Sequence, residues 1–307
     1  MTKILISGIT GFVGTNLEKY LLSYLPDIEI SGITRSIAYN NSVNMSDLDS
    51  TNGYDVVIHL AGKAHDFKKV SKPEEYYEVN TMLTKKLYDL FILSDSKKFI
   101  FISSVKAVKD SVDEILTEDN IPNPQTHYGK SKLLAEQYIQ EQDLPNEKSY
   151  YILRPCMIHG RGNKGNLNLL YQFVNKGIPY PLGAFKNQRS FLSVDNLCFI
   201  VKELIQQPIN SGIYNVSDDE SISTTELVSI ISNACNKKTK IWNLPIILIL
   251  SMGKIGDFFK LPFDTEKLNK LTENYQVSNQ KIKLAINKEL PLSARQGLEQ
   301  TTNSFIG

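Results

Sequence analysis

A tyrosine and a lysine that stand four residues apart, Tyr128 and Lys132, are the pair in this chain best suited to proton transfer. Positions i and i+4 share one face of a helix, so the phenol and the ammonium can meet at one site. A nearby positive charge favours the phenolate, and we expect it to lower the tyrosine pKa from its ordinary value near ~10. The pair is a candidate general acid and base. The same spacing also occurs on solvated helix faces, so the surrounding motifs decide.

A glycine-rich segment, GITGFVG at residues 8–14, follows a short apolar run and precedes a stretch of helical length. Glycines permit a tight turn and let the backbone approach a pyrophosphate, which the positive end of the following helix attracts. The spacing is G-x-x-G-x-x-G. We expect this turn to bind a dinucleotide through Gly8, Gly11, Phe12, Val13 and Gly14.

The residues that follow the second apolar run bear on which dinucleotide is bound. An NAD-binding chain places an acid there, roughly twenty residues after the last glycine, for the ribose hydroxyls. This chain has Thr34-Arg35-Ser36 instead. A guanidinium suits a 2′-phosphate, so we predict a preference for NADP(H), with NAD(H) also possible. The alternative is that Arg35 points into solvent. Asp47, in the next loop, is a candidate contact for the adenine.

The elements that position these residues alternate between strands and helices through the first half of the chain. Runs rich in Ile, Val and Leu predict strands at 3–7, 28–34, 56–60, 99–103 and 150–153. Amphipathic segments predict helices at 12–24, 73–94 and 128–142. This order predicts an α/β fold with a Rossmann-type doubly wound parallel sheet.

The second half of the chain follows a different pattern. Residues 160–191 are rich in Gly, Asn and Lys around one expected helix at 167–176, and the chain from 221 onward is mostly helical. We expect a smaller, mainly helical carboxy-terminal substrate domain made of 161–189 and 217–307. Residues 1–160, together with roughly 190–216, would form the dinucleotide-binding domain, and the site would lie in the cleft between the two.

Composition excludes several classes of protein. The net charge is +1, with 34 basic and 33 acidic residues, so nothing indicates a nucleic-acid partner. Three dispersed cysteines and four dispersed histidines lack metal-ligand spacing and fit a reduced, cytoplasmic setting without a metal site. The run at the amino terminus is too short for a secretory signal. The apolar stretch 244–252 is too short to be a transmembrane segment, and we expect a core helix beginning at Pro245 rather than a surface that touches lipid.

Together these motifs resemble the extended short-chain dehydrogenase/reductase family, in its branch of nucleotide-sugar epimerases and reductases. The segment DVVIHLAG at 55–62 resembles the family's strand beneath the nicotinamide ribose, and Asn80 resembles its active-site-supporting asparagine. The serine pair Ser103-Ser104 ends the next strand of the family pattern. The resemblance implies cofactor contacts at Leu60, Ala61, Gly62, Asn80, Tyr128, Lys132 and Pro155.

The resemblance also implies a mechanism. Tyr128 would exchange a proton with a sugar hydroxyl or its ketone, and Lys132 would keep the phenol acidic and bind the ribose. Ser104, the third catalytic residue, would hydrogen-bond the same sugar oxygen. Hydride would pass between the sugar and the nicotinamide.

Substrate contacts are implied by the second half of the family pattern. The segment that includes Asn166 resembles the sugar-nucleotide loop, and Arg189 stands where the family places an arginine for the substrate diphosphate. Alternatively, Arg189 is a surface charge. We expect Asp195 to cap a helix that starts at Asn196. Val105-Lys106 occupy the places of the dehydratase Asp-Glu pair, which argues against sugar dehydration.

Three functions remain open at this point. The leading one is an NAD(P)-dependent 4-epimerase of a UDP-hexose or UDP-N-acetylhexosamine, working through a transient 4-keto sugar in surface polysaccharide biosynthesis. The second is an NADPH-dependent reductase of a 4-keto-6-deoxy nucleotide sugar, which Arg35 favours. The third is a noncatalytic NADP-sensing protein. By resemblance we also expect a homodimer that pairs helices 73–94 and 128–142.

Overall fold

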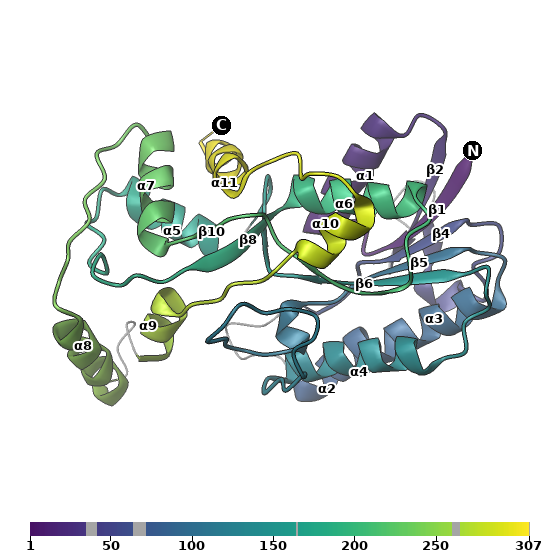
Figure 1. Ribbon diagram of the computed structural model, residues 1–307, viewed down its shortest axis with the longest axis horizontal. Coiled ribbons are helices and arrows are strands. Elements are labelled where there is room, and N and C mark those ends of the chain that lie inside the picture. Colours follow the sequence, from purple (N-terminus) through teal and green to yellow (C-terminus); the bar gives the residue numbers. More distant parts are fainter. Residues whose placement is uncertain (35–41, 64–71, 164, 260–264, 307) are drawn as a thin grey trace.

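A parallel β-sheet forms the larger part of the computed structural model, which describes residues 1–34, 42–63, 72–163, 165–259 and 265–306, without the side chains of 166, 266, 267 and 270 (Figure 1). Seven strands lie in the order β3-β2-β1-β4-β5-β6-β9, and every neighbouring pair is parallel. Their bounds are β1 Thr2–Ser7, β2 Ile28–Thr34, β3 Ser42–Asn44, β4 Val56–His59, β5 Lys98–Ile102, β6 Ser149–Pro155 and β9 Gly212–Val216.

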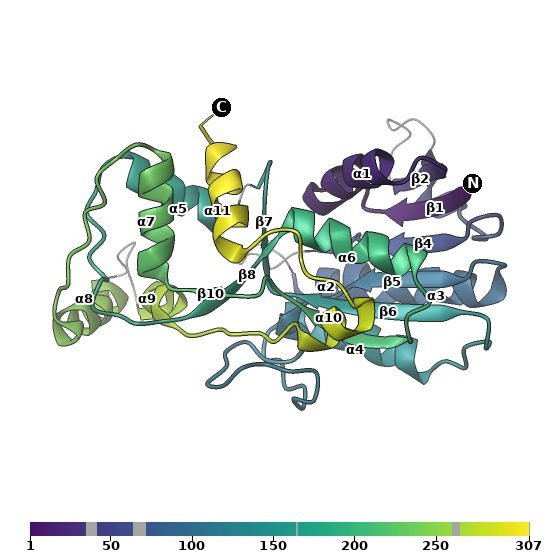
Figure 2. The same cartoon turned by 45° about the horizontal axis from the view of Figure 1, so that its top comes forward.

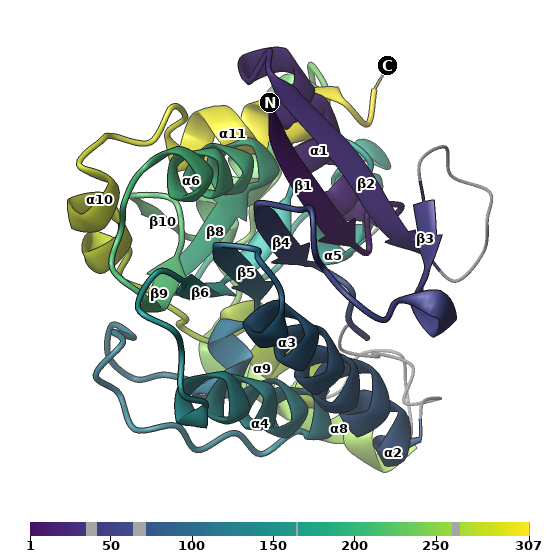
Figure 3. The same ribbon diagram turned by 90° about the vertical axis from the view of Figure 1, so that its right-hand side faces the viewer.

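Helices cover both faces of this sheet (Figure 3). One face carries α1 (Phe12–Tyr24), α6 (Val194–Gln206) and α10 (Gln280–Ile286). The other carries α2 (Pro73–Tyr76), a π-helical turn (Tyr77–Met82), α3 (Leu83–Leu93) and α4 (His127–Glu141). The predicted doubly wound α/β fold is confirmed.

Alternation along the strands divides the apolar core between these two faces. Ile4 and Ile6 of β1 belong to the core under α1 and α6, whereas Leu5 belongs to the core under α3 and α4. Ile100 and Phe99 of β5 separate in the same way. Successive strand side chains point to opposite faces, so a strand covered on both sides is apolar throughout.

A second, smaller assembly lies beyond the carboxyl ends of these strands (Figure 2). Its three-stranded sheet has the order β10-β8-β7, with bounds β7 Met157–His159, β8 Arg189–Ser193 and β10 Ser221–Ile222. The helices around it are α5 (Asn166–Asn175), α7 (Thr224–Ala234), α8 (Ile246–Phe259), α9 (Thr265–Thr272) and α11 (Ala294–Asn303). Their buried side chains form a separate apolar core.

Two local expectations in this half are wrong. Helix α6 begins at Val194, and the hydroxyl of Ser193 caps it by accepting a hydrogen bond from the Asp195 N–H, so Asp195 is not the cap. Helix α8 is not a core helix, because Ile247 is 80% exposed and Phe258 is 82% exposed, while Ile249 is buried. Within the described residues, no helix combines the length and apolar character needed to cross a bilayer.

Candidate active site

The glycine turn between β1 and α1 is closed so tightly that side chains do not fit. Gly8 has φ of +75°, in the region that glycine favours, and a Cβ there would lie 2.7 Å from the Ala61 nitrogen. A Cβ on Gly14 would lie 2.4 Å from the Gly8 carbonyl oxygen. Gly11 is the N-cap of α1, so the N–H groups of Phe12 and Val13 open the helix. The turn therefore offers the backbone cradle and helix end that a pyrophosphate requires.

The loop after β4 is held beside this turn. The Leu60 N–H donates to the Ser7 carbonyl at 3.0 Å, and the Ala61 N–H donates to the Ser7 hydroxyl at 3.3 Å. A Cβ on Gly62 would lie 3.1 Å from the Lys132 Nζ. The three residues that the resemblance implied as cofactor contacts thus lie between the glycine turn and the lysine.

Asn80 connects the same loop to α4. Its side-chain oxygen accepts from the Lys63 N–H at 2.7 Å, and its amide donates to the Lys63 carbonyl at 3.1 Å and to the Ser131 hydroxyl at 3.0 Å. Asn80 lies in the π-helical turn, a distortion that is frequent at functional sites. These bonds fix the β4 loop against the helix that carries Tyr128 and Lys132.

Tyr128, Ser104 and Lys132 meet at the carboxyl end of β5. Tyr128 lies in the first turn of α4, and the Ser104 side chain is close enough to affect its pKa. Lys132, one turn later, is buried, and its Nζ donates to the Ile102 carbonyl at 2.9 Å. The structure therefore brings the three predicted catalytic residues together.

Gly129 permits this meeting, and sequence reasoning missed it. A Cβ at this position would lie 2.3 Å from the Lys106 carbonyl oxygen in the turn that follows Ser104. Helix α4 can approach that turn closely only because the residue after Tyr128 is glycine. Its place directly beside the candidate catalytic tyrosine was the available sequence signal.

Burial, rather than a charge pair, dominates the protonation of the two groups. The pKa of Tyr128 is raised above its ordinary value because the phenol is desolvated, and the neighbouring Ser104 side chain opposes this only in part. The expected lowering of the Tyr128 pKa is therefore wrong for the protein groups alone. Burial lowers the pKa of Lys132 to about 8, with the charge of Glu136 opposing the shift.

A buried ion pair involves the residue one helical turn after Lys132 on α4. Arg154 Nη2 lies 2.6 Å from Glu136 Oε2, its Nε donates to both carboxylate oxygens at 3.0 and 3.1 Å, and the Ser103 hydroxyl donates to the same carboxylate. Both charged groups are almost fully buried, so each depends on the other. Glu136 is four residues after Lys132, and this spacing was the only hint in the sequence.

Arg189 begins β8 in the smaller, three-stranded assembly. Its guanidinium lies 3.8 Å from the Glu273 carboxylate, and its side chain is 24% exposed. Burial lowers the pKa of Arg189, and Glu273 opposes that shift. The partly open guanidinium could exchange Glu273 for an anionic ligand.

Tyr275 links the chain beside Arg189 to the turn after Ser104, a contact that the sequence did not predict. Its N–H donates to the Gln188 carbonyl at 2.9 Å, and its phenol donates to the Lys109 carbonyl at 2.6 Å. The Lys106 Nζ lies 4.2 Å from the centre of the Tyr275 ring. The chain beside Arg189 is therefore fixed to the turn after Ser104.

The remaining predicted residues are placed as follows. Asp47 follows β3, where its carboxylate accepts from the Ser46 hydroxyl at 2.8 Å, and Pro155 ends β6. Both lie at the carboxyl edge of the sheet, as does the glycine turn. Asn166 begins α5, but its side chain is outside the described part. Arg35 also lies outside the described residues, so the structure does not test its role.

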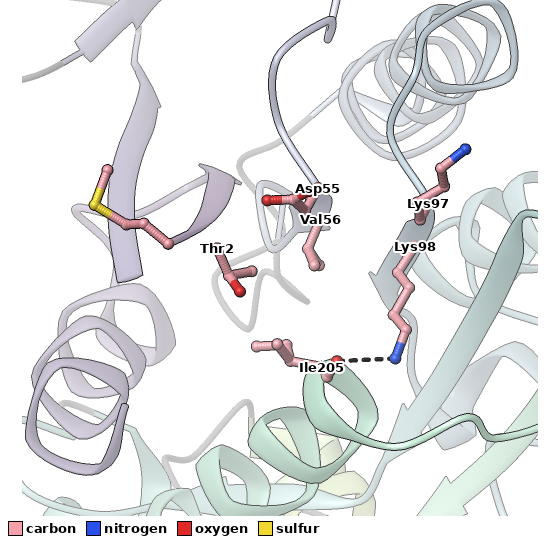
Figure 4. Close-up of a pocket in the computed structure, with 7 residues that line it drawn as sticks. Thr2, Asp55, Val56, Lys97, Lys98 and Ile205 are labelled. Atoms are coloured by element: carbon pink, nitrogen blue, oxygen red, sulfur yellow. Dashed lines mark hydrogen bonds between the residues drawn. The ribbon is translucent and has the colours of Figure 1, made fainter. Parts of the chain in front are cut away.

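Two other features do not contribute to this site. A hollow of about 300 Å³ lies at the amino ends of β1, β4 and β5, on the opposite edge of the sheet (Figure 4). There Lys98 Nζ already donates to the carbonyls of Leu204, Ile205 and Gln207 at the end of α6. In the part of the chain that the structure describes, no three His, Cys, Asp or Glu side chains are grouped as metal ligands.

Comparison with known proteins agrees with this arrangement. A family model described as the NAD dependent epimerase/dehydratase family matches residues 4–217. A UDP-glucose 4-epimerase of Vibrio cholerae is 32% identical over 319 residues, covering 99% of this chain and 95% of that protein. An N-acetyl-alpha-D-glucosaminyl-diphospho-ditrans,octacis-undecaprenol 4-epimerase of Escherichia coli O157:H7 is 30% identical, covering 91% and 84%.

A solved structure shows the same fold. The crystal structure of a UDP-N-acetylglucosamine 4-epimerase from Bacillus cereus matches all of both chains with a TM-score of 0.79 at 21% identity. The predicted enzyme class and extended short-chain dehydrogenase/reductase assignment are confirmed, and the chain belongs to the NAD dependent epimerase/dehydratase family.

Proposed function

We propose that the protein is an NAD(P)-dependent 4-epimerase of a UDP-hexose or UDP-N-acetylhexosamine. The observation that carries this proposal is that Tyr128, Ser104 and Lys132 lie together at the carboxyl edge of the sheet, beside the glycine turn. Relatives that are 4-epimerases support the choice of reaction. The reaction would serve surface polysaccharide biosynthesis in the cytoplasm.

Tyr128 and Ser104 would each have a separate role in one reversible oxidation of the sugar. Tyr128 would take the proton of the sugar 4-hydroxyl while Ser104 hydrogen-bonds its oxygen, and the C4–H bond electrons would leave with that hydrogen as hydride. When bound, the dinucleotide accepts and returns that hydride, and its oxidised ring is a cation that opposes the effect of burial on the Tyr128 pKa. Once the 4-keto sugar has turned its other face toward the dinucleotide, Tyr128 would return the proton to the oxygen on C4.

Substrate and cofactor would be held from opposite sides of the cleft. Arg189 and Asn166 would bind the sugar nucleotide, and Arg189 would meet its diphosphate in place of Glu273. The substrate domain would comprise 161–189 and 217–307. We keep the preference for NADP(H), which depends on Arg35. Exposed Met82, Leu93 and Leu134 support a homodimer through α3 and α4, being 59%, 84% and 44% exposed.

A lipid diphosphate is a second candidate for the group that carries the sugar. The Escherichia coli relative that covers most of this chain acts, by its name, on an undecaprenol diphosphate. The sugar chemistry would be unchanged, because Tyr128 and Ser104 would act on C4 whatever the diphosphate carries.

The reductase remains the alternative reaction, because Arg35 suits NADPH. Two assays of the purified protein separate it from the epimerase. An epimerase converts UDP-glucose or UDP-N-acetylglucosamine to its C4 epimer, followed by NMR, with no net use of dinucleotide. A reductase leaves these sugars unchanged and oxidises NADPH in step with reduction of a 4-keto-6-deoxy sugar nucleotide.

The Tyr128→Phe variant tests whether the protein is catalytic at all. If it were only an NADP sensor, this variant would keep both dinucleotide binding and biological activity. The proposal predicts that it keeps binding and loses activity.

A further inference from the structure

Helix α8 places apolar side chains on the outside of the protein along most of its length. It lies at one end of the molecule, beyond α9 and away from the seven-stranded sheet (Figure 1). Exposed residues on this helix are Ile246, Ile247, Leu248, Leu250, Met252, Ile255, Phe258 and Phe259, each at least 42% exposed. A group of large apolar side chains of this kind marks an interaction surface.

The inner side of α8 is narrow and already occupied. Ile249, Gly253 and Gly256 are its buried residues. A Cβ on Gly253 would lie 3.4 Å from the Leu268 side chain, so α8 and α9 pack closely along this line. The single acid of the helix, Asp257, faces α9 as well, where it accepts from the Thr265 N–H at 3.0 Å. Asp257 is exposed, but its carboxylate is held at the edge of α8 that faces α9.

The charged residues in the chain that leads into α8 indicate the kind of surface that the helix meets. Between Glu226 and Asp257 the chain has four lysines and no acidic residue. The lysines are all exposed: Lys237, Lys238, Lys240 and Lys254. Trp242, which is 54% exposed, precedes the helix. Lys254 lies on α8 itself, and the segment that carries the other three lysines and Trp242 joins α7 to α8 along the same end of the molecule (Figure 1). Exposed lysines and an indole on the same end as an apolar helix match the charged interface of an anionic bilayer, where Trp is enriched.

We propose that the outward face of α8 docks on the surface of an anionic lipid bilayer. The helix has 14 residues and is about 21 Å long, shorter than the roughly 30 Å hydrocarbon core, so it lies along the surface. Its neighbour α9 leads to the substrate side, because Asn187 donates to the carbonyls of Leu271 and Glu273. Docking thus holds the cleft near the bilayer.

Vesicle sedimentation with the full-length protein tests this proposal. The vesicles are phosphatidylcholine alone, or an equal mixture with phosphatidylglycerol. The docking variant is Ile247→Ser with Phe258→Ser, positions that are 80% and 82% exposed. The matched control is Ile121→Ser with Leu284→Ser, positions that are 83% and 71% exposed but distant in sequence from α8. A third variant, Lys237→Gln with Lys238→Gln and Lys240→Gln, removes charge without touching the helix.

The proposal expects the wild type to bind the mixed vesicles more strongly than phosphatidylcholine. The docking variant should bind about tenfold more weakly, the control within about twofold of wild type, and the lysine variant about fivefold more weakly. Thermal unfolding and dinucleotide binding, measured alongside, show that each variant is folded. These readings do not depend on the sugar substrate, so they stand apart from the proposed reaction.

Three results would overturn the proposal. The wild type could stay in the supernatant with both vesicles. The control could lose as much binding as the docking variant, which would indicate general stickiness. Light scattering could show a wild-type dimer that the docking variant breaks, without vesicle binding, which would assign this face to a second copy of the chain.

Discussion

The turn around Tyr128 and the helix α8 use apolar and polar groups in opposite ways. Around Tyr128 even charged groups are buried, and Glu136, Arg154 and Lys132 each have a partner at hydrogen-bond distance. On α8 most apolar side chains are exposed, and its buried residues are Ile249 and two glycines. Packing around Tyr128 fixes the positions of its side chains, whereas α8 leaves an apolar surface exposed. Substitutions should therefore affect activity in the first region and binding in the second.

Loss of the phenol should have the largest effect. Tyr128→Phe removes the proton donor and acceptor but keeps the ring, so we expect kcat to fall by about 10²–10⁴ with little change in stability. Steady-state assays and thermal unfolding measure both quantities. A variant with nearly full kcat would remove Tyr128 from the reaction.

Removal of one partner of the buried ion pair should have the next largest effect. Glu136→Gln leaves the Arg154 guanidinium buried without its counter-charge, so we expect a loss of about 3–5 kcal/mol in the free energy of unfolding. Urea denaturation measures the difference. Glu141→Gln, at an exposed position on the same helix, should change stability by less than about 0.5 kcal/mol. Equal effects at both positions would show that the buried pair is unimportant.

The two sides of α8 should respond differently to the same change. Ile249→Ala removes a buried side chain and should cost about 2–5 kcal/mol, whereas Ile247→Ala, at an exposed position, should cost less than about 0.5 kcal/mol. Denaturation of both variants in the absence of lipid gives the comparison. A large loss at Ile247 would show that the outer face is packed in solution.

One added methyl group should disturb the close packing of α4 on the turn that follows Ser104. Gly129→Ala places a Cβ against the Lys106 carbonyl, and we expect a loss of about 1–3 kcal/mol in stability with a lower kcat. Lys130→Ala, exposed on the next position of the helix, is the control and should be nearly neutral. If Gly129→Ala were as active and stable as Lys130→Ala, the close approach would not matter.

The smallest effect concerns pH. Burial lowers the pKa of Lys132 to about 8 from 10.5, so the folded protein binds fewer protons than the unfolded chain between these values. The contribution of Lys132 to stability should therefore rise with pH from about 8 to 10.5. The difference in unfolding free energy between wild type and Lys132→Met, measured across this range, should show it. A flat difference would mean that Lys132 titrates normally.

Local patterns in the sequence predicted the parts of the site that depend on neighbours along the chain. The glycine turn, the strand ends and the spacing of Tyr128 and Lys132 are of this kind. The contacts of Gly129 with Lys106, and of Tyr275 with Lys109, join segments that only the fold brings together.

Two wrong expectations have a common physical cause. The pKa of Tyr128 was expected to fall because a lysine is near, and α8 was expected in the core because it is apolar. In both cases the degree of burial decides the outcome. Neither residue type nor spacing gives the burial of a side chain, which depends on the packing of distant segments.

The most direct test of the central claim follows the hydrogen at C4 during epimerisation in deuterium oxide. If Tyr128 takes only the hydroxyl proton and the C4 hydrogen leaves and returns as hydride, NMR and mass spectrometry will find ordinary hydrogen at C4 of the product. Deuterium at C4 would mean that the carbon exchanges protons with solvent, and the proposed roles of Tyr128 and the dinucleotide would be wrong.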